Sequence, residues 1–237
     1  MLLGRFRVGE PLGAGGMGTV YWAEHVALEM PVAIKVIAGD PTSEKWGTLE
    51  ARFEREARTL ARMRSEFVCR VLDFGKLDSG EPFLVLEFLD GKPLTVVADH
   101  ERLSLEERVD FLAQGIAGVA EAHRLGLVHR DLKPSNLFIA SVQGERRQTK
   151  VIDFGVVRAA DGAIVTRGDS LLGTPEFMSP EQVLSAHDVD ARTDVWSLGA
   201  TLFWLLSGEL PFDGASRLQL LASIAKDPPR AWLLEGR

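Results

Sequence analysis

The stretch of sequence that most constrains this chain is 129–155. It reads H-R-D-L-K-P-S-N, then L-F-I-A, a polar loop, K-V-I and finally D-F-G. The runs 137–140 and 150–152 are rich in residues that favour β-strands. Pairing them as an antiparallel hairpin brings Asn136 and Asp153 side by side at its open end.

The loop before this hairpin adds Asp131 and Lys133 to the same place, because Pro134 keeps the segment out of a helix. One loop and one hairpin therefore gather two carboxylates, an amide and an ammonium group. This set suits phosphoryl transfer, since Asp153 and Asn136 supply the oxygen ligands that Mg²⁺ prefers. Asp131 can accept the proton of an attacking hydroxyl, and Lys133 can stabilise charge on the moving phosphoryl group.

Each of these residues alone fits a polar turn, but the whole pattern does not: D-F-G starts seventeen residues after the asparagine of H-R-D-x-K-x-x-N. The pattern resembles the catalytic and metal-binding loops of eukaryotic-type (Hanks-type) serine/threonine protein kinases, here of a bacterial kind. The resemblance implies an α+β, bilobal protein-kinase-like fold over residues 1–237. The N-lobe (1–89) would hold a small antiparallel sheet with one regulatory helix, and the C-lobe (90–237) would be mainly helical. Kinase domains normally continue with further helices, so we expect a domain truncated at its C-terminus, lacking its last helices and exposing apolar surface near Phe203 and Leu220.

Charge and cysteine content restrict the partners and the compartment. A net charge of −7 and a pI near 5.3 argue against nucleic acid or an anionic membrane as the main partner. The single cysteine, Cys69, excludes an internal disulfide, fits a reducing compartment and, in an apolar run, predicts a buried small hydrophobe. No signal peptide is visible, and the apolar stretch 195–206 is too short to span a bilayer and reads as a core helix. We therefore expect a cytoplasmic protein with no membrane span.

A glycine-rich loop, 13–18, lies between the predicted strands 5–12 and 19–22. The alternative is a dinucleotide-binding fingerprint, which needs a helix after the glycines and an acidic residue such as Asp40. The β character of 19–22 and the helix-breaking Pro31 argue against it. A glycine loop between two strands instead resembles the phosphate-covering loop of protein kinases.

The next predicted strand, 31–37, places Ala33 and Lys35 on one face. An isolated lysine there would be a solvated edge residue, but V-A-I-K after the glycine loop matches the kinase lysine that binds the α- and β-phosphates. The helix predicted over 43–63 carries Glu56, which by resemblance pairs with Lys35. A movement of this helix that brings Glu56 in or out would switch the activity on or off.

Two further strands are predicted over 68–74 and 83–89. By resemblance, Leu86 guards the back of the adenine pocket, and the backbones of Glu87 and Leu89 hydrogen-bond the adenine. Pro93 replaces a common acidic ribose contact. The resemblance assigns ATP binding to Leu12, Gly13, Ala14, Gly15, Gly16, Met17, Gly18, Thr19, Val20, Ala33, Lys35, Leu86, Glu87 and Leu89.

The C-terminal half begins with a capping box of Ser104 and Glu107, followed by a helix that ends near Gly126 and supports the catalytic loop. His129 fits a structural role better than that of a proton shuttle. Asp194 starts a second helix and, by resemblance, holds the backbone of the catalytic loop. A further helix is predicted over 218–225.

Between Asp153 and Glu181 the chain is glycine-rich, with exposed hydroxyls at Thr166 and Ser170. Arg130 would bind a phosphate on either of them, although both could equally be ordinary loop hydroxyls. The run 173–182, G-T-P-E-F-M-S-P-E-Q, resembles the family's substrate-docking loop and A-P-E box, with Ser179 in place of alanine. Its Thr174 would bridge Asp131 and Lys133 and favours serine or threonine as the acceptor.

The leading hypothesis is therefore a serine/threonine protein kinase that uses ATP and Mg²⁺. Asp131, Lys133, Lys35 and Glu56 would be its catalytic residues, with Asn136 and Asp153 as metal ligands. Its partners would be protein substrates with a serine or threonine acceptor, and a dimer could serve autophosphorylation at Thr166 or Ser170. Two alternatives remain open: an ATP-binding, pseudokinase-like scaffold or regulator inactivated by truncation, and a small-molecule phosphotransferase with a kinase-like fold.

Overall fold

The structure is a computed structural model that describes residues 2, 4–15, 18–39, 42–43, 46–142, 146–154, 175–184 and 189–231. The strands are β1 (Phe6–Gly15), β2 (Gly18–His25), β3 (Met30–Ile37), β4 (Val71–Lys76), β5 (Pro82–Glu87), β6 (Gly91–Pro93), β7 (Leu137–Val142) and β8 (Arg146–Val151). The helices are α1 (Trp46–Leu60), α2 (Leu94–His100), α3 (Leu105–Arg124), α4 (Pro180–Leu184), α5 (Arg192–Ser207) and α6 (Arg217–Lys226). Short 3₁₀ turns cover Pro134–Asn136 and Pro175–Phe177.

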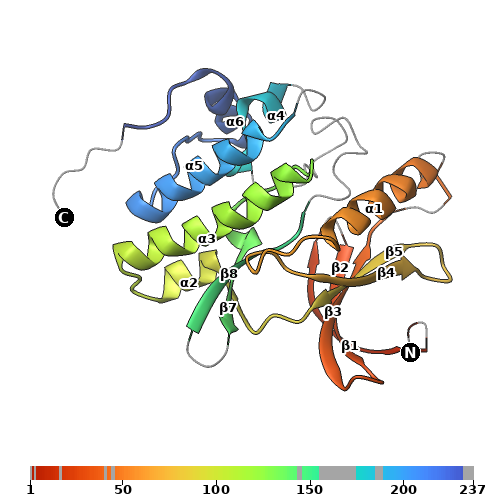
Figure 1. Ribbon diagram of the computed structural model, residues 1–237. Helices are drawn as coiled ribbons and strands as arrows, with labels where there is room; N and C mark the ends of the chain where they lie inside the picture. The colour runs from red at the N-terminus through yellow and green to blue at the C-terminus, as the bar shows by residue number, and fades with distance from the viewer. Residues whose placement is uncertain are drawn as a thin grey trace.

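The first lobe is an antiparallel sheet in the order β1-β2-β3-β5-β4, with α1 packed beside it (Figure 1). Alternation along β3 sends Val32 and Ile34 into one buried cluster and Lys35 and Ile37 toward the other face. This is the alternation that the sequence predicts. Gly18, which opens β2, has a φ of +136°, and a Cβ there would lie 1.9 Å from the Val36 carbonyl oxygen, so the position requires glycine.

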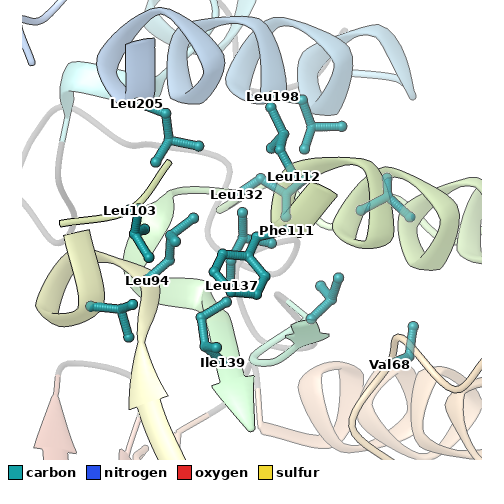
Figure 2. Close-up of a cluster of buried hydrophobic side chains, with 13 residues drawn as sticks. Val68, Leu94, Leu103, Phe111, Leu112, Leu132, Leu137, Ile139, Leu198 and Leu205 are labelled. Atoms are coloured by element: carbon teal, nitrogen blue, oxygen red, sulfur yellow. The ribbon is translucent and has the colours of Figure 1, made fainter. Parts of the chain in front are cut away.

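The second lobe is built on α3 and α5, which lie side by side (Figure 1). Leu112 on α3 and Leu198 and Leu205 on α5 meet in one buried cluster, into which Leu132 of the catalytic loop also points (Figure 2). Leu137 of the β7–β8 hairpin joins the same cluster. The loop and the hairpin that carry the predicted catalytic residues are thus fixed to the helices by apolar packing.

The α+β, bilobal fold is confirmed, and the local signals around α3 are confirmed with it. Ser104 Oγ accepts from the Glu107 amide while the Glu107 side chain accepts from the Ser104 amide, which completes the capping box. Gly126 follows the helix with a φ of +75°.

Several boundaries differ from the predictions. The hairpin strands run through Val142 and from Arg146, because the antiparallel ladder continues through the pairs Ser141–Arg147 and Val142–Arg146. The pair β6–β7 and the helix α2 were not predicted. Val68 lies outside β4 in an isolated bridge.

The expected distribution of exposed apolar surface is also partly wrong. Leu220 is buried against Phe212 and Ile224. Its neighbour Leu218 is nevertheless 77% exposed, and Leu202, next to Phe203, is 36% exposed, so exposed apolar side chains do lie near both predicted positions. In addition α5, predicted as a buried core helix, exposes Val195 (63%). Among the described residues, no helix has the length and apolar character needed to cross a membrane.

Candidate active site

The catalytic loop brings together the three polar residues predicted for it. Lys133 Nζ lies 3.2 Å from Asp131 Oδ2. Asn136 Nδ2 donates to the Asp131 carbonyl at 2.8 Å and lies 3.4 Å from its carboxylate. The hairpin register places Leu137 opposite Val151, and the Ile152 amide donates to the Asn136 carbonyl at 3.0 Å. Asn136 and Asp153 therefore flank the open end of the hairpin, as predicted.

Asp194, at the start of α5, fixes the backbone of the catalytic loop. Its buried carboxylate accepts from the backbone amides of His129 (2.8 Å) and Arg130 (2.9 Å) and contacts His123 Nε2 at 2.7 Å. His129 is itself fully buried, contacts the Ile152 carbonyl through Nε2 at 2.9 Å, and has a pKa lowered by burial. A buried, neutral imidazole bonded to backbone is a structural element, in line with the prediction.

Two residues of this site have left-handed backbone conformations, Arg130 at φ +64° and Asp153 at φ +60°. Such positions cost about 1–3 kcal/mol each and are kept only where surrounding bonds fix them. Two hydrogen bonds fix Arg130. Its amide donates to the Asp194 carboxylate, and its carbonyl accepts from Gln182 Nε2 at 2.8 Å.

The strongest contact between the lobes at the site joins Lys35 to Asp153. Lys35 Nζ lies 2.8 Å from Asp153 Oδ1, and the lysine side chain is only 8% exposed. The lysine of β3 and the aspartate that follows β8, 118 residues apart in sequence, thus meet at one point. In this structure Lys35 pairs with Asp153 and not with Glu56, the predicted partner.

Glu56 lies half-buried on α1, and burial raises its pKa from 4.5 to about 7. Arg130, Arg52 and Arg55 act in the opposite direction and do not offset the desolvation. Lys35 is not among the charges that lower this pKa.

A small pocket lies behind the Lys35–Asp153 pair, with about 30 Å³ of room, enough for one or two water molecules. Its lining residues come from both lobes and are Lys35, Ile37, Leu60, Cys69, Val71, Leu84, Leu86, Val151, Asp153 and Phe154. Leu86, predicted to guard the back of the adenine pocket, is one of these lining residues. Burial raises the pKa of the Cys69 thiol, which agrees with the expectation of an unreactive small hydrophobe.

Comparison with known proteins decides which family this geometry represents. A model of the protein kinase domain matches residues 6–231. The chain belongs to the protein kinase family.

Among the relatives of this kinase chain, serine/threonine-protein kinase pkn2 of Myxococcus xanthus is 41% identical over 234 residues, 97% of this chain and 27% of that protein. Serine/threonine-protein kinase PknA of Mycobacterium tuberculosis is 37% identical over 233 residues, 96% of this chain and 52% of that protein. A crystal structure of Rad53 1–466 in complex with AMP-PNP superposes with a TM-score of 0.74 and 26% identity, covering 93% of this chain and 53% of that one. The kinase chain thus spans about a quarter to a half of the length of these relatives.

The other predicted nucleotide contacts of this kinase line the edge of the first lobe. Leu12, Gly13, Ala14 and Gly15 form the exposed end of β1, while Gly18, Thr19 and Val20 begin β2. Ala33 is buried in β3 opposite Leu86. Glu87 ends β5 and Leu89 follows it, half-buried. Gly16, Met17, Thr166, Ser170 and Thr174 lie outside the described residues.

The segment 175–184 of the kinase chain is bonded to the catalytic loop and to α5 by contacts that sequence analysis did not predict. Gln182 reaches the Arg130 carbonyl, and Ser179 Oγ lies 2.7 Å from Thr193 Oγ1. Ser197 Oγ donates to the Phe177 carbonyl at 2.7 Å. The serine that replaces the family's alanine is therefore satisfied by a hydroxyl of α5, a pairing with no local sequence signal.

Proposed function

We propose that this chain transfers the γ-phosphoryl group of ATP to serine and threonine hydroxyls of protein substrates. The observation that carries the proposal is the meeting of Lys35 and Asp153 at 2.8 Å beside the Asp131–Lys133–Asn136 cluster. The names of the relatives support serine/threonine acceptors, and the Rad53 complex with AMP-PNP supports a nucleotide between the lobes.

In this mechanism Asp131 accepts the proton of the substrate hydroxyl as the oxygen attacks. Lys133, 3.2 Å from the same carboxylate, stabilises the charge that develops on the transferred group. Lys35 exchanges its contact with Asp153 for the α- and β-phosphates. The backbones of Glu87 and Leu89 bind the adenine, and the residues of the glycine loop cover the phosphates.

The donor set also fits Mg²⁺. In the hydrogen bonds described above Asn136 uses its Nδ2, which leaves the amide oxygen for a hard cation beside the Asp153 carboxylate. Asn136 and Asp153 would hold the ion, and bound Mg²⁺ supplies neutralisation of phosphate charge.

Control of this activity would lie in Glu56 and in the segment after Asp153. Glu56 would pair with Lys35 once α1 moves inward and Asp153 is engaged elsewhere. Phosphate added at Thr166, or else at Ser170, by a second copy of the chain would bind Arg130. Peptide mapping after incubation with Mg-ATP tests this, and an absence of phosphate between 156 and 178 contradicts it.

The test of the function compares the wild-type chain with Asp131→Ala for ATP binding and for phosphate transfer to protein and metabolite acceptors. We expect both chains to bind ATP and only the wild type to phosphorylate protein. If both bind ATP and neither transfers phosphate, the chain is a nucleotide-binding scaffold. Transfer only to metabolites would assign it to small-molecule phosphotransferases.

A further inference from the structure

A second set of polar contacts joins the two lobes through segment 64–70, α3 and β8. The segment 64–70 follows α1 in the chain but bonds to the second lobe. The Arg64 and Ser65 amides donate to the Glu121 carboxylate of α3 at 3.0 and 2.6 Å. This segment therefore bonds to α3 although it leads into β4 of the first lobe.

The same segment also pairs with β8. The Cys69 amide donates to the Val151 carbonyl at 3.0 Å, and the Val151 amide donates to the Phe67 carbonyl at 2.8 Å. Packing here is tight, since a Cβ at Gly118 of α3 would lie 2.8 Å from the Phe67 carbonyl oxygen. The strand that ends just before Asp153 and the chain that leads into β4 thus form one rigid unit.

One partly buried ion pair, in which the Glu87 side chain is 25% exposed, connects this unit to the end of β5. Lys150 Nζ lies 3.0 Å from Glu87 Oε1, with the lysine side chain 9% exposed. The same oxygen accepts from the Arg70 amide at 2.9 Å, and the Glu87 amide donates to the Arg70 carbonyl at 3.0 Å. Both the backbone and the side chain of Glu87 are therefore fixed to the unit formed by segment 64–70 and β8.

This pair connects two parts of the proposed nucleotide site, the adenine-binding backbone and the strand that leads to the metal ligand. Glu87 belongs to the backbone proposed to bind the adenine, and Lys150 precedes the proposed metal ligand Asp153 by three residues. A buried pair contributes little net stability, because desolvation offsets much of the attraction. Such a pair instead fixes the positions of its two residues, here Glu87 and Lys150, relative to each other.

We infer that Lys150 is a positioning residue for nucleotide binding, which acts through Glu87 to fix the adenine-binding backbone relative to Asp153. The inference rests on the proposed function. This role differs from that of a residue in an ordinary structural ion pair. Loss of an ordinary pair lowers the melting temperature and leaves the affinity for nucleotide unchanged.

The test measures the Kd of Mg-ADP by calorimetry, the KM and kcat for ATP, and the melting temperature, on the whole chain. We expect Lys150→Met to raise the Kd and the KM about 3- to 30-fold while kcat stays within about twofold. Lys150→Arg, which keeps the charge, restores most of the affinity. The matched control is Lys76→Met, which breaks a 2.8 Å pair with Glu50 away from the pocket and leaves the Kd as in the wild type.

Glu87→Gln provides the second variant, because it keeps the side-chain shape and the contacts with Arg70. It tests the inference even if Lys150→Met does not fold. We expect it to raise the Kd similarly, and the double variant to be no weaker than the weaker single one. A Kd within twofold of wild type in folded Glu87→Gln, or additive losses, overturns the inference. A wild-type chain that binds Mg-ADP but transfers no phosphate overturns the proposed function alone, while one that binds no nucleotide overturns both.

Discussion

At the scale of single residues, the site depends on which carboxylate Lys35 contacts. The resemblance to protein kinases predicts Glu56 as this partner. The structure selects Asp153 at 2.8 Å and leaves Glu56 in a desolvated position. Lys35 and Asp153 are 118 residues apart in sequence, so this contact is a tertiary one that no local pattern encodes.

Glu56 consequently makes the stability of the fold depend on pH. Its pKa of about 7 in the folded chain exceeds the ordinary 4.5, so the folded chain binds more protons between these values. Stability then falls as the pH rises through this window. We expect Glu56→Gln to raise the melting temperature at pH 8 by about 2–4 °C, the shift that about 1 kcal/mol gives in a domain of this size.

The same variant should gain much less at pH 5, where Glu56 is already neutral in the folded chain. Thermal unfolding at both pH values measures this. Glu54→Gln is the control, because Glu54 pairs with Arg58 on the exposed face of α1, and it should show no such difference. An equal gain for Glu56→Gln at both pH values would contradict the account.

At the scale of elements, those with strong local sequence signals were predicted correctly, and those that depend on tertiary pairing were not. The helix α3 was predicted because its capping box and Gly126 mark its two ends. The three-residue strand β6 exists only through its pairing with β7 and has no signal of its own. The apolar run of α5 predicted burial all round, yet part of one face, at Val195 and Leu202, is exposed.

The connection between α5 and the catalytic loop predicts a large effect for one substitution. Asp194→Ala leaves the amides of His129 and Arg130 buried without their acceptor, at a cost of about 2–5 kcal/mol. Urea unfolding measures this. Asp190→Ala, four residues earlier and exposed, should leave the midpoint close to that of the wild type. A similar midpoint for Asp194→Ala would show that the loop is held by other contacts.

At the scale of the whole molecule, the two lobes are joined by close packing as well as by ion pairs. The site residues themselves were largely predictable, because the kinase motifs are local in sequence. The contact Lys150–Glu87 between the lobes and the contact Gln182–Arg130 within the second lobe were not, since their partners lie 63 and 52 residues apart.

Two glycines in helix interiors test the packing between the lobes. Alanine favours helix over glycine by about 1 kcal/mol, so Gly199→Ala on α5, with open space around it, should raise the melting temperature by about 2–4 °C. At Gly118 the new Cβ meets the Phe67 carbonyl, so Gly118→Ala should lower the melting temperature instead. Equal gains in both variants would mean that segment 64–70 is free to move away from α3.

The central claim is that Lys35 from one lobe and Asp131, Asn136 and Asp153 from the other act on a single ATP. The most direct measurement is transfer of labelled γ-phosphate from ATP to a generic basic protein, for the wild type beside Lys35→Met. The account predicts transfer by the wild type, at about 1–100 s⁻¹ in a fully assembled kinase, and a loss of at least about 100-fold in the variant. Equal rates in the two proteins, or no transfer by folded wild-type protein, would contradict it.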